Sequence, residues 1–391
     1  MDLPLPFIAE AQRLVLSQRL SQATALIQER LGARPASGAS AAGFDGLTIE
    51  LSAGPAAGTQ PAPPPPGAGL RSRPRFAFAQ GAATPLRPVA AEVDIPAGAQ
   101  LLRLEHDGPF GRRSFRLYVP AAVGEGPRPL VVMLHGCTQS PEDFAAGTRM
   151  NALAEEFGFL VAYPEQPRAA NPSLCWNWFD PAHQRGGAGE PAILAGIVAD
   201  IARDHPVDPD RIFAAGLSAG GAMAAVLGST RADLFAAVGI HSGLPRGSAD
   251  SVAAALSVMR SGRSARGEAG APEVPAIIFH GTRDTTVHPA NGDRLAGLGT
   301  IGRHANDRVI QGSANGRAFV RSVRAADGTA PARELWRVEG LGHAWSGGDA
   351  QGSYADPAGP DASREMLRFF LEHPRRSEPG APSVSPASPA P

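Results

Sequence analysis

The chain has 391 residues, 43% of them hydrophobic, which is enough for one large α/β domain or two ordinary domains. A formal net charge of −1 and the lack of a dense basic run argue against a nucleic-acid-binding protein. The sequence has no apolar run of about eighteen residues or more, so we expect no transmembrane segment, and two cysteines are too few for a disulfide scaffold.

Apolar residues recur at helical spacing near the N-terminus, so residues 1–31 are predicted to hold an amphipathic helix. We expect it to pack on the main domain or on a second copy of the chain, with contact to a polymer granule as an alternative. Residues 32–90, rich in Ala, Gly and Pro, are predicted to be a disordered linker, and residues 375–391 a disordered tail. The N-terminus lacks the features of a secretory signal, which favours a cytoplasmic location.

Segments with strand and helix patterns alternate within residues 91–374, which we predict to be the catalytic domain. They begin with a hairpin and continue with strands that alternate with helices, so we expect a mainly parallel central sheet with helices on both faces. Functional residues gather at the carboxyl ends of the strands in such sheets. The expected strands are Leu101–His106, Arg113–Val119, Pro129–Leu134, Phe159–Tyr163, Arg211–Leu217, Ala236–Ile240, Val274–His280 and Arg333–Val338, and the expected helices are Pro141–Phe157, Ala188–Asp204 and Asp361–His373.

The most informative motif is Gly216-Leu-Ser-Ala-Gly220, which follows the strand Arg211–Leu217 and precedes a run of small, helix-prone residues. A serine between two glycines at a turn from strand to helix is typical of a nucleophile elbow, where the glycines let the hydroxyl of Ser218 stand clear of the sheet. The pentapeptide alone would be weak evidence, because Gly- and Ala-rich chains produce it by chance. Its position between a strand and a helix makes it much stronger.

A serine hydroxyl needs a base to take its proton, and a histidine base needs an acid to fix its tautomer. Asp284 follows the strand Val274–His280, and His343 lies in a glycine-rich loop after the strand Arg333–Val338, which gives the chain order Ser, Asp, His. A turn or helix-cap role is the alternative for Asp284. We expect surface positions for His288, His304 and His373, structural roles for His241 and His280, and helix or loop positions for Asp233, Asp250, Asp293, Asp307 and Asp327.

Acyl transfer also needs hydrogen-bond donors for the developing oxyanion. We expect one of them to be the backbone N–H of Ala219, directly after the candidate nucleophile. The other is expected in the loop after Pro129–Leu134, where the N–H of Cys137 is the candidate. No cluster of His, Cys and carboxylate residues has metal-ligand spacing, so we expect neither a metal nor a cofactor.

Several motifs together resemble the poly(3-hydroxybutyrate) depolymerase-like esterases of the α/β-hydrolase superfamily, a group that includes feruloyl and acetylxylan esterases. The resemblance covers roughly Leu101 to His373, and it implies an α/β-hydrolase fold with Ser218 as nucleophile, His343 as base and Asp284 as its orienting acid. Many members are exported, so an extracellular location is the alternative to a cytoplasmic one. The motifs are His135-Gly-Cys-Thr-Gln139, Cys175-Trp-Asn-Trp-Phe179, Gly216-Leu-Ser-Ala-Gly-Gly221, His280-Gly-Thr-Arg-Asp284 and Gly342-His-Ala-Trp-Ser-Gly-Gly348.

Aromatic residues flank the expected site. Trp176, Trp178 and Trp345 are predicted to line its mouth and bind an extended acyl chain, a polyester strand or a phenolic acid, with a role as packed hydrophobic anchors as the alternative. Cys137 and Cys175 are both expected on loops at the same sheet edge. A disulfide between them is a hypothesis, and free buried thiols are the alternative.

From these features we expect a serine esterase that hydrolyses carboxylic esters through an acyl-enzyme, acting on poly(3-hydroxybutyrate) or its oligomers. The alternative in the same class is a feruloyl or acetylxylan-type esterase. A peptidase is a further possibility, because related folds cleave peptides. From a different class, the chain could be a non-catalytic polyester-granule-binding protein with a relic site, but the intact serine, acid and histidine argue against that reading.

Overall fold

The computed structural model describes residues 93–121, 126–263, 270–297, 307–328 and 330–375, all within the unit Leu86–Pro391. The predicted amphipathic helix (1–31), the predicted linker (32–90) and all but the first residue of the predicted tail (375–391) lie outside the described residues. Those three assignments, and the granule contact or self-association expected of the helix, therefore stay predictions.

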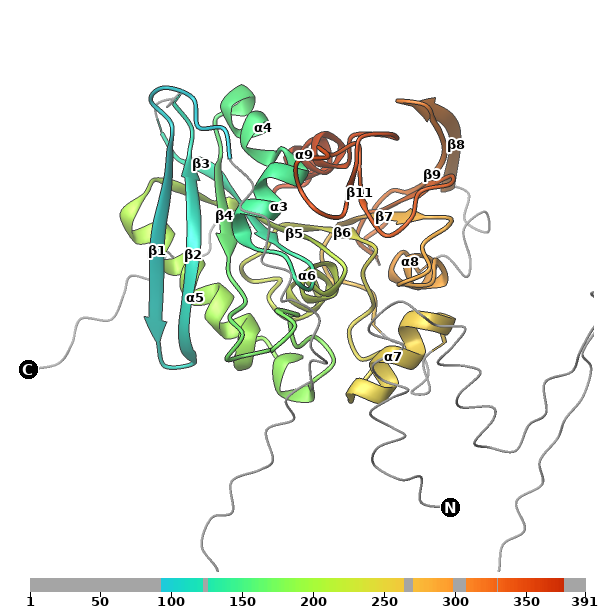
Figure 1. Cartoon of the computed structure of the whole chain (residues 1–391), viewed down its shortest axis with the longest axis horizontal. Helices are drawn as coiled ribbons and strands as arrows, with labels where there is room; N and C mark the ends of the chain where they lie inside the picture. The colour runs from blue at the N-terminus through green and yellow to red at the C-terminus, as the bar shows by residue number, and fades with distance from the viewer. Residues whose placement is uncertain (1–92, 122–125, 264–269, 298–306, 329, 376–391) are drawn as a thin grey trace, which may run out of the picture. The chain divides into compact units, whose positions relative to one another are not determined.

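A ten-stranded mixed sheet forms the centre of the described domain (Figure 1). The strand order is β1-β2-β4-β3-β5-β6-β7-β10-β9-β8, and neighbours from β4 to β10 are parallel. An antiparallel hairpin borders the sheet at each edge, β1–β2 on one side and β8–β9 on the other. The bounds are β1 Gln100–Gly108, β2 Gly111–Val119, β3 Arg128–Leu134, β4 Leu160–Pro164, β5 Val207–Leu217, β6 Ala237–His241, β7 Ala276–Gly281, β8 Asp307–Ala314, β9 Arg317–Arg324 and β10 Arg333–Val338.

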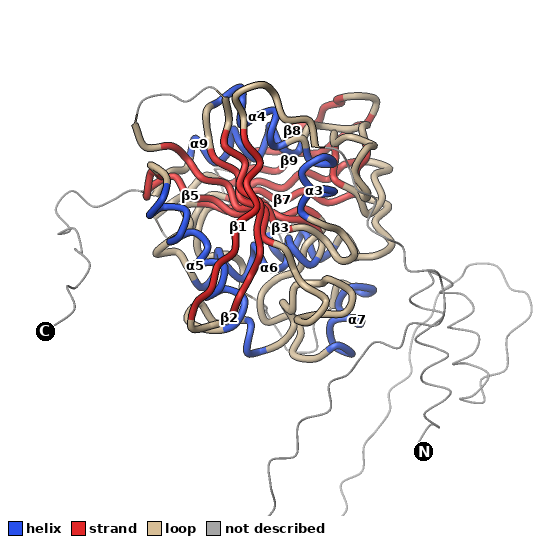
Figure 2. Tube along the Cα trace, turned by 60° about the vertical axis from the view of Figure 1, so that its left-hand side comes forward, coloured by secondary structure: helices blue, strands red, loops and turns tan. Residues whose placement is uncertain are grey.

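Helices cover both faces of the sheet, as Figure 2 shows, and each face has its own hydrophobic core. Alternate residues of a strand point to opposite faces, so Leu130 and Val132 of β3 enter one core, while Val131 and Met133 enter the other. The first core also holds residues of α5, α6 and α7, and the second holds residues of α3, α4 and α9. The bounds are α3 Pro141–Thr148, α4 Met150–Phe157, α5 Gly189–Asp204, α6 Ala219–Thr230, α7 Val252–Ser261, α8 Ala290–Leu295 and α9 Ala362–Glu372.

The predicted helix at Pro141–Phe157 is two helices, because Arg149 adopts a left-handed backbone conformation with φ 55° between α3 and α4. The break leaves the carbonyl of Thr148 free to accept a hydrogen bond from the hydroxyl of Ser363 in α9, with an O···O distance of 2.6 Å. A second difference concerns Asp307, which we expected in a helix or loop. It is the first residue of β8, whose hairpin with β9 the sequence reading did not predict.

The chain changes direction across the sheet at β3. It proceeds from β3 to β4 on one side and then returns to place β5 on the other side of β3. The loops that follow β3 and β5 therefore lead away from each other at the carboxyl ends of two neighbouring strands. Open α/β sheets bind their ligands at such a point, so the expected location of the site agrees with the topology.

The part of the chain that the structure describes has no helix long and apolar enough to cross a bilayer. Within the same residues, no group of three or more His, Cys, Asp or Glu side chains is arranged to hold a metal ion.

Three buried histidines, His135, His241 and His280, lie at the carboxyl ends of β3, β6 and β7. Burial lowers the pKa of His135 to about 4 and that of His241 to about 3, and it also lowers the pKa of His280. The neutral ring of His135 satisfies both nitrogens, since Nδ1 donates to the Gly136 carbonyl at 2.7 Å and Nε2 accepts from the N–H of Gln166 at 3.1 Å. These imidazoles therefore serve the fold as uncharged groups.

We predict that the free energy of unfolding falls as the pH falls from about 6.5 to about 5, because the unfolded chain binds protons at these imidazoles and the folded chain does not. The slope approaches about 1.4 kcal/mol per pH unit for each histidine. Urea unfolding at several pH values between about 6.5 and about 5 measures the free energy of unfolding, and His241→Asn should reduce its slope against pH. A stability that is independent of pH in this window would contradict the prediction.

Candidate active site

Ser218 occupies the turn between β5 and α6. Its backbone has φ 58° and ψ −117°, a conformation that residues other than glycine rarely adopt and that is often found at functional sites. The N–H of Ser218 donates to the carbonyl of His241 at 2.9 Å, which ties the turn to the end of β6. The local geometry is that of the nucleophile elbow predicted from the pentapeptide.

The two glycines of the pentapeptide are a steric requirement of this turn. A Cβ atom on Gly216 would overlap the backbone of Gly220, and a Cβ atom on Gly220 would overlap the carbonyl oxygen of Leu134 in β3. The start of α6 therefore lies directly against the ends of β3 and β5. Glycine at both positions lets the helix begin close enough to hold Ser218 at the sheet edge.

Asp284 and His343 form a hydrogen-bonded pair across the loops that follow β7 and β10. Nδ1 of His343 lies 2.8 Å from Oδ2 of Asp284, and the aspartate side chain is completely buried. The other carboxylate oxygen, Oδ1, accepts from the backbone N–H groups of Thr286 at 2.9 Å and Val287 at 2.8 Å. Both oxygens of Asp284 thus have partners, and one of them fixes the orientation of the imidazole.

The carboxylate of Asp284 is stabilised in its charged form. Burial alone would raise its pKa, but the hydrogen bond and charge of His343, the nearby His280 and the N–H of Val287 outweigh burial and lower the pKa to about 2. Nε2 of His280 lies 3.6 Å from Oδ2 of Asp284 and 2.8 Å from the carbonyl of Val287, to which it donates. Asp284 is therefore a carboxylate throughout the range in which an esterase is assayed.

The loop that carries His343 is fixed to the loop after β7. The N–H of Arg283 donates to the Leu341 carbonyl, and the N–H of Gly340 donates to the hydroxyl of Thr282, both at 3.0 Å. A Cβ on Gly281 would overlap the carbonyl of Leu341, so the two loops are in close contact. Glycine at the end of β7 therefore allows the loop of His343 to pack closely against the loop after β7.

His241 joins the elbow to the loop of His343. Its carbonyl accepts from Ser218, while its ring nitrogen Nε2 accepts from the N–H of Ser346 at 3.0 Å. The ring stacks on Phe279, with centroids 5.8 Å apart, and on Trp345, with centroids 5.1 Å apart. The expectation of a structural role for His241 agrees with these contacts, which connect the segments that carry Ser218 and His343.

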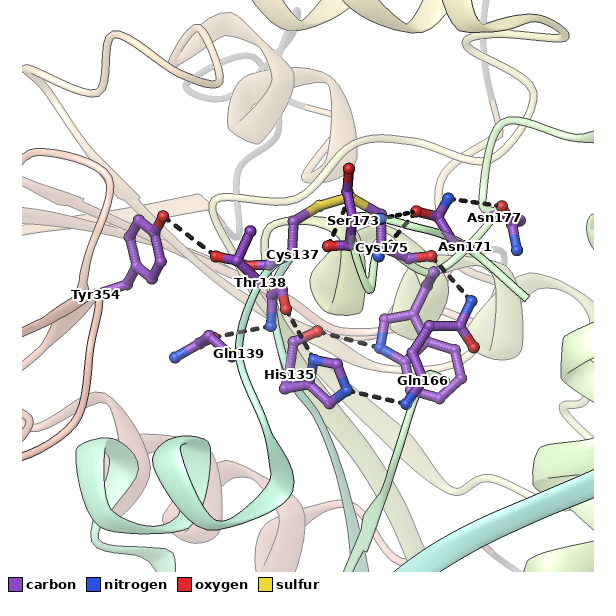
Figure 3. The surroundings of a disulfide bond; sticks show 12 residues. His135, Cys137, Thr138, Gln139, Gln166, Asn171, Ser173, Cys175, Asn177 and Tyr354 are labelled. Carbon is purple, nitrogen blue, oxygen red and sulfur yellow. Dashed lines mark hydrogen bonds between the residues drawn. A yellow bond between two sulfur atoms is a disulfide. The ribbon is translucent and has the colours of Figure 1, made fainter. Parts of the chain in front are cut away.

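A disulfide joins Cys137 to Cys175, which confirms the hypothesis of a bond over the alternative of free thiols (Figure 3). Two hydrogen bonds run beside it, from the N–H of Thr138 to the Ser173 carbonyl at 2.8 Å and from the indole of Trp176 to the His135 carbonyl at 3.1 Å. The loop after β3 is thereby attached to the loop that follows β4.

The two candidate oxyanion donors belong to segments that adjoin Ser218. Ala219 is the first residue of α6, so its N–H is among those that have no partner within the helix. Cys137 follows Gly136, where an added Cβ would lie 3.7 Å from the Cβ of Ser218, so the loop after β3 contacts the elbow. Among the described residues, neither N–H donates to a protein acceptor.

The tryptophans do not line an open mouth as we expected. Trp176, Trp178 and Trp345 are only 0%, 5% and 1% exposed, and the indole of Trp345 donates to the hydroxyl of Ser363 at 3.0 Å. They are packed anchors, the alternative considered for them. The prediction assumed that large rings beside the site bind the ligand. Their burial instead stabilises the loops that carry the site residues.

Tyr354 is an aromatic residue of the site that the sequence reading missed. It precedes the short strand β12 (Ala355–Asp356), which pairs with β11 (Trp345–Ser346). Its ring meets that of His343 edge to face with centroids 6.3 Å apart, and its side chain is exposed. No local pattern marks this tyrosine, because only the pairing of β11 with β12 brings it to His343.

Residues 113–301 match the family model described as esterase PHB depolymerase. The chain is 33% identical over 228 residues to poly(3-hydroxyalkanoate) depolymerase C of Paucimonas lemoignei, a match that covers 55% of this chain and 54% of that protein. It is 28% identical to a probable acetylxylan esterase A of Aspergillus fumigatus (55% and 62% covered) and 30% identical to feruloyl esterase B of Neurospora crassa (44% and 64% covered). The chain thus spans about half to two thirds of the length of these curated relatives.

Among solved structures, an acetyl xylan esterase from Aspergillus awamori resembles this one with a TM-score of 0.52 and 20% sequence identity, over 70% of this chain and 98% of that protein. At this identity the likeness concerns the fold alone, and it agrees with the mainly parallel sheet described above. The comparisons confirm the resemblance expected from the sequence: residues 113–301 match the esterase PHB depolymerase family model, and the domain has an α/β-hydrolase fold.

Proposed function

We propose that this protein is a serine esterase that hydrolyses carboxylic esters through a covalent acyl-enzyme, with Ser218, His343 and Asp284 as its catalytic residues. The observation that carries the proposal is the buried Asp284–His343 pair, connected through His241 to a serine in a strained turn. Ser242 also has a positive φ, of 48°, but it is completely buried, whereas Ser218 keeps 8% exposure at the start of α6. A relic site would be expected to lack at least one catalytic residue, whereas Ser218, His343 and Asp284 are all present.

In the proposed reaction, Nε2 of His343 takes the proton of the Ser218 hydroxyl as its oxygen attacks the ester carbonyl carbon. The hydrogen bond to Asp284 keeps the proton of the imidazole on Nδ1 and stabilises the imidazolium that forms. His343 then gives its proton to the leaving alcohol, and a water activated in the same way releases the acid. The structure assigns no hydrogen bond between Ser218 and His343, and such bonds are often long without substrate and shorten in the complex.

The backbone N–H groups of Cys137 and Ala219 are the proposed oxyanion hole. Support comes from their position beside Ser218 and from the lack of a protein acceptor for either among the described residues. Ala219 also begins α6, whose N-terminus carries partial positive charge that favours an anion. Donors fixed in advance stabilise the tetrahedral intermediate without the cost of reorganising when charge develops.

As substrate we propose poly(3-hydroxybutyrate) or its oligomers, in keeping with the family description and the named depolymerase relative. Acetylxylan-type and feruloyl esters are the alternatives, because relatives with those names match a similar part of the chain. A disulfide is typical of proteins in oxidising compartments, so we also propose that the protein acts outside the cytoplasm.

Ser218→Ala and His343→Ala should each lower kcat for p-nitrophenyl butyrate by about 10⁴-fold or more, and Asp284→Asn somewhat less, because the members of a triad act as a unit. Initial rates test this, with circular dichroism as a check on folding. The matched control is Ser229→Ala, which changes a serine elsewhere on α6 whose hydroxyl bonds only the Ala225 carbonyl. Turnover retained by Ser218→Ala would reject the proposed nucleophile.

Breaking the disulfide should lower kcat for soluble esters by about 10- to 100-fold with a smaller effect on KM, because the N–H of Cys137 would lose its fixed position. Cys175→Ser or reduction tests this in steady-state assays. The Cys137→Ser/Cys175→Ser variant is the control, since reductant should not change its activity further. Full activity after complete reduction would contradict the proposed role of this loop.

A substrate panel should give the highest kcat/KM for hydroxybutyrate oligomers, ahead of feruloyl esters and acetylated sugars. Polymer granules should also become clear in the presence of the protein, and Ser218→Ala should abolish clearing. A higher kcat/KM for feruloyl esters or acetylated sugars would reject poly(3-hydroxybutyrate) as the substrate in favour of that class of ester. Binding to granules without any clearing would favour the granule-binding alternative.

A further inference from the structure

Two hydroxyl-bearing side chains from separate loops meet next to the candidate active site. The phenol oxygen of Tyr354 lies 3.5 Å from Oγ1 of Thr138, and both residues are exposed. Figure 3 shows the two side chains facing each other. Tyr354 is 42% exposed, which is unusual for a large aromatic side chain at the centre of a set of packed loops. At 3.5 Å their mutual hydrogen bond is at the outer limit, so both hydroxyls can engage a third partner.

Each of the two residues adjoins a different member of the proposed catalytic set. Thr138 directly follows Cys137, the proposed oxyanion donor, while the ring of Tyr354 faces His343, the proposed base. An ester bound at Ser218 between the oxyanion hole and the base therefore has this pair beside it. The Tyr354–Thr138 pair can touch a substrate without taking part in proton transfer.

Both residues have left-handed backbones, with φ 66° at Thr138 and φ 52° at Tyr354. This conformation is uncommon for a bulky or β-branched residue and costs of order 1 kcal/mol or more. Hydrogen bonds hold it in place, because the N–H of Thr138 donates to Ser173 and the carbonyl of Tyr354 accepts from the N–H of Trp345 at 2.7 Å. The surrounding structure therefore maintains an unfavourable backbone at both of the residues that meet.

A buried network fixes the spacing of the two loops. The amide of Gln139 accepts from the N–H of Gly136 and donates to Asp143 and to the carbonyl of Ser353, each at 2.9 Å. Asp143 in turn accepts from the N–H of Ser353 at 2.7 Å. Because Gln139 follows Thr138 and Ser353 precedes Tyr354, this network holds the two hydroxyls at a set separation.

We propose that Tyr354 and Thr138 form a specificity subsite for a second oxygen function on the substrate, beside the scissile ester. The hydroxyl of Thr138 already donates to the Cys137 carbonyl at 2.6 Å, so it can accept from a substrate hydroxyl. The Tyr354 phenol can donate to an oxygen of the substrate. A 3-hydroxyacyl ester, free or extended into an oligomer, supplies such an oxygen, whereas a plain alkyl ester does not.

This inference rests on the proposed esterase function, and two substrates that differ by one oxygen test it. We would measure kcat/KM for p-nitrophenyl 3-hydroxybutyrate and p-nitrophenyl butyrate with the full-length protein, Tyr354→Phe and Thr138→Val. Tyr354→Phe should lower the preference for the hydroxylated ester by about 5- to 10-fold, mainly through KM, and Thr138→Val should change it in the same direction. Phe110→Ala, which removes an exposed ring from the β1–β2 hairpin, is the control and should leave the preference unchanged.

An unchanged ratio of the two kcat/KM values in both variants would overturn the subsite. An equal loss of kcat/KM on both substrates would also overturn it, because it would mean that the two residues only stabilise the loops. The failure of the proposed function gives a different result: the unmodified protein would hydrolyse neither ester, or Ser218→Ala would hydrolyse both. In that case the subsite proposal falls together with the proposed function.

Discussion

The arrangement depends above all on the buried hydrogen bond between Asp284 and His343. Parallel pairing of β7 with β10 brings the loops of these two residues together, although 59 positions separate them in the chain. Backbone donors occupy the other aspartate oxygen, so the carboxylate stays charged despite its burial. His241 then connects the imidazole loop with the turn of Ser218, through one carbonyl and one ring nitrogen. The parallel sheet brings these residues close together, and the charged carboxylate of Asp284 and the neutral ring of His241 fix how they are oriented.

The opposite side of the site is held by a separate set of bonds. The Cys137–Cys175 disulfide joins the loop after β3 to the loop after β4, and Gln139 joins it to the segment before β12. These connections hold the loop of Cys137 beside the segment that carries Tyr354. Two adjacent residues of one loop thus have different proposed roles. The main-chain N–H of Cys137 is proposed to bind the oxyanion, and the side chain of Thr138 is proposed to select the substrate.

Features encoded by adjacent residues could be predicted from the sequence. The apolar run of β3 and the pentapeptide around Ser218 identified a strand and an elbow, because steric and burial requirements act over a few residues. The hairpin turn at Asn315 and Gly316 was missed although both have positive φ and this dipeptide is a strong hairpin signal. The exposure of Tyr354 and the burial of the tryptophans could not be predicted, since both depend on contacts between loops far apart in the chain.

The central claim is that Ser218 is a nucleophile activated by the His343–Asp284 pair. Its most direct test is covalent labelling by an alkyl fluorophosphonate, followed by mass spectrometry of the peptides. The account predicts one phosphonyl group per chain, attached to Ser218, and a rate of labelling that falls steeply in His343→Ala. Labelling of another residue, or labelling of Ser218 at an unchanged rate without His343, would contradict it.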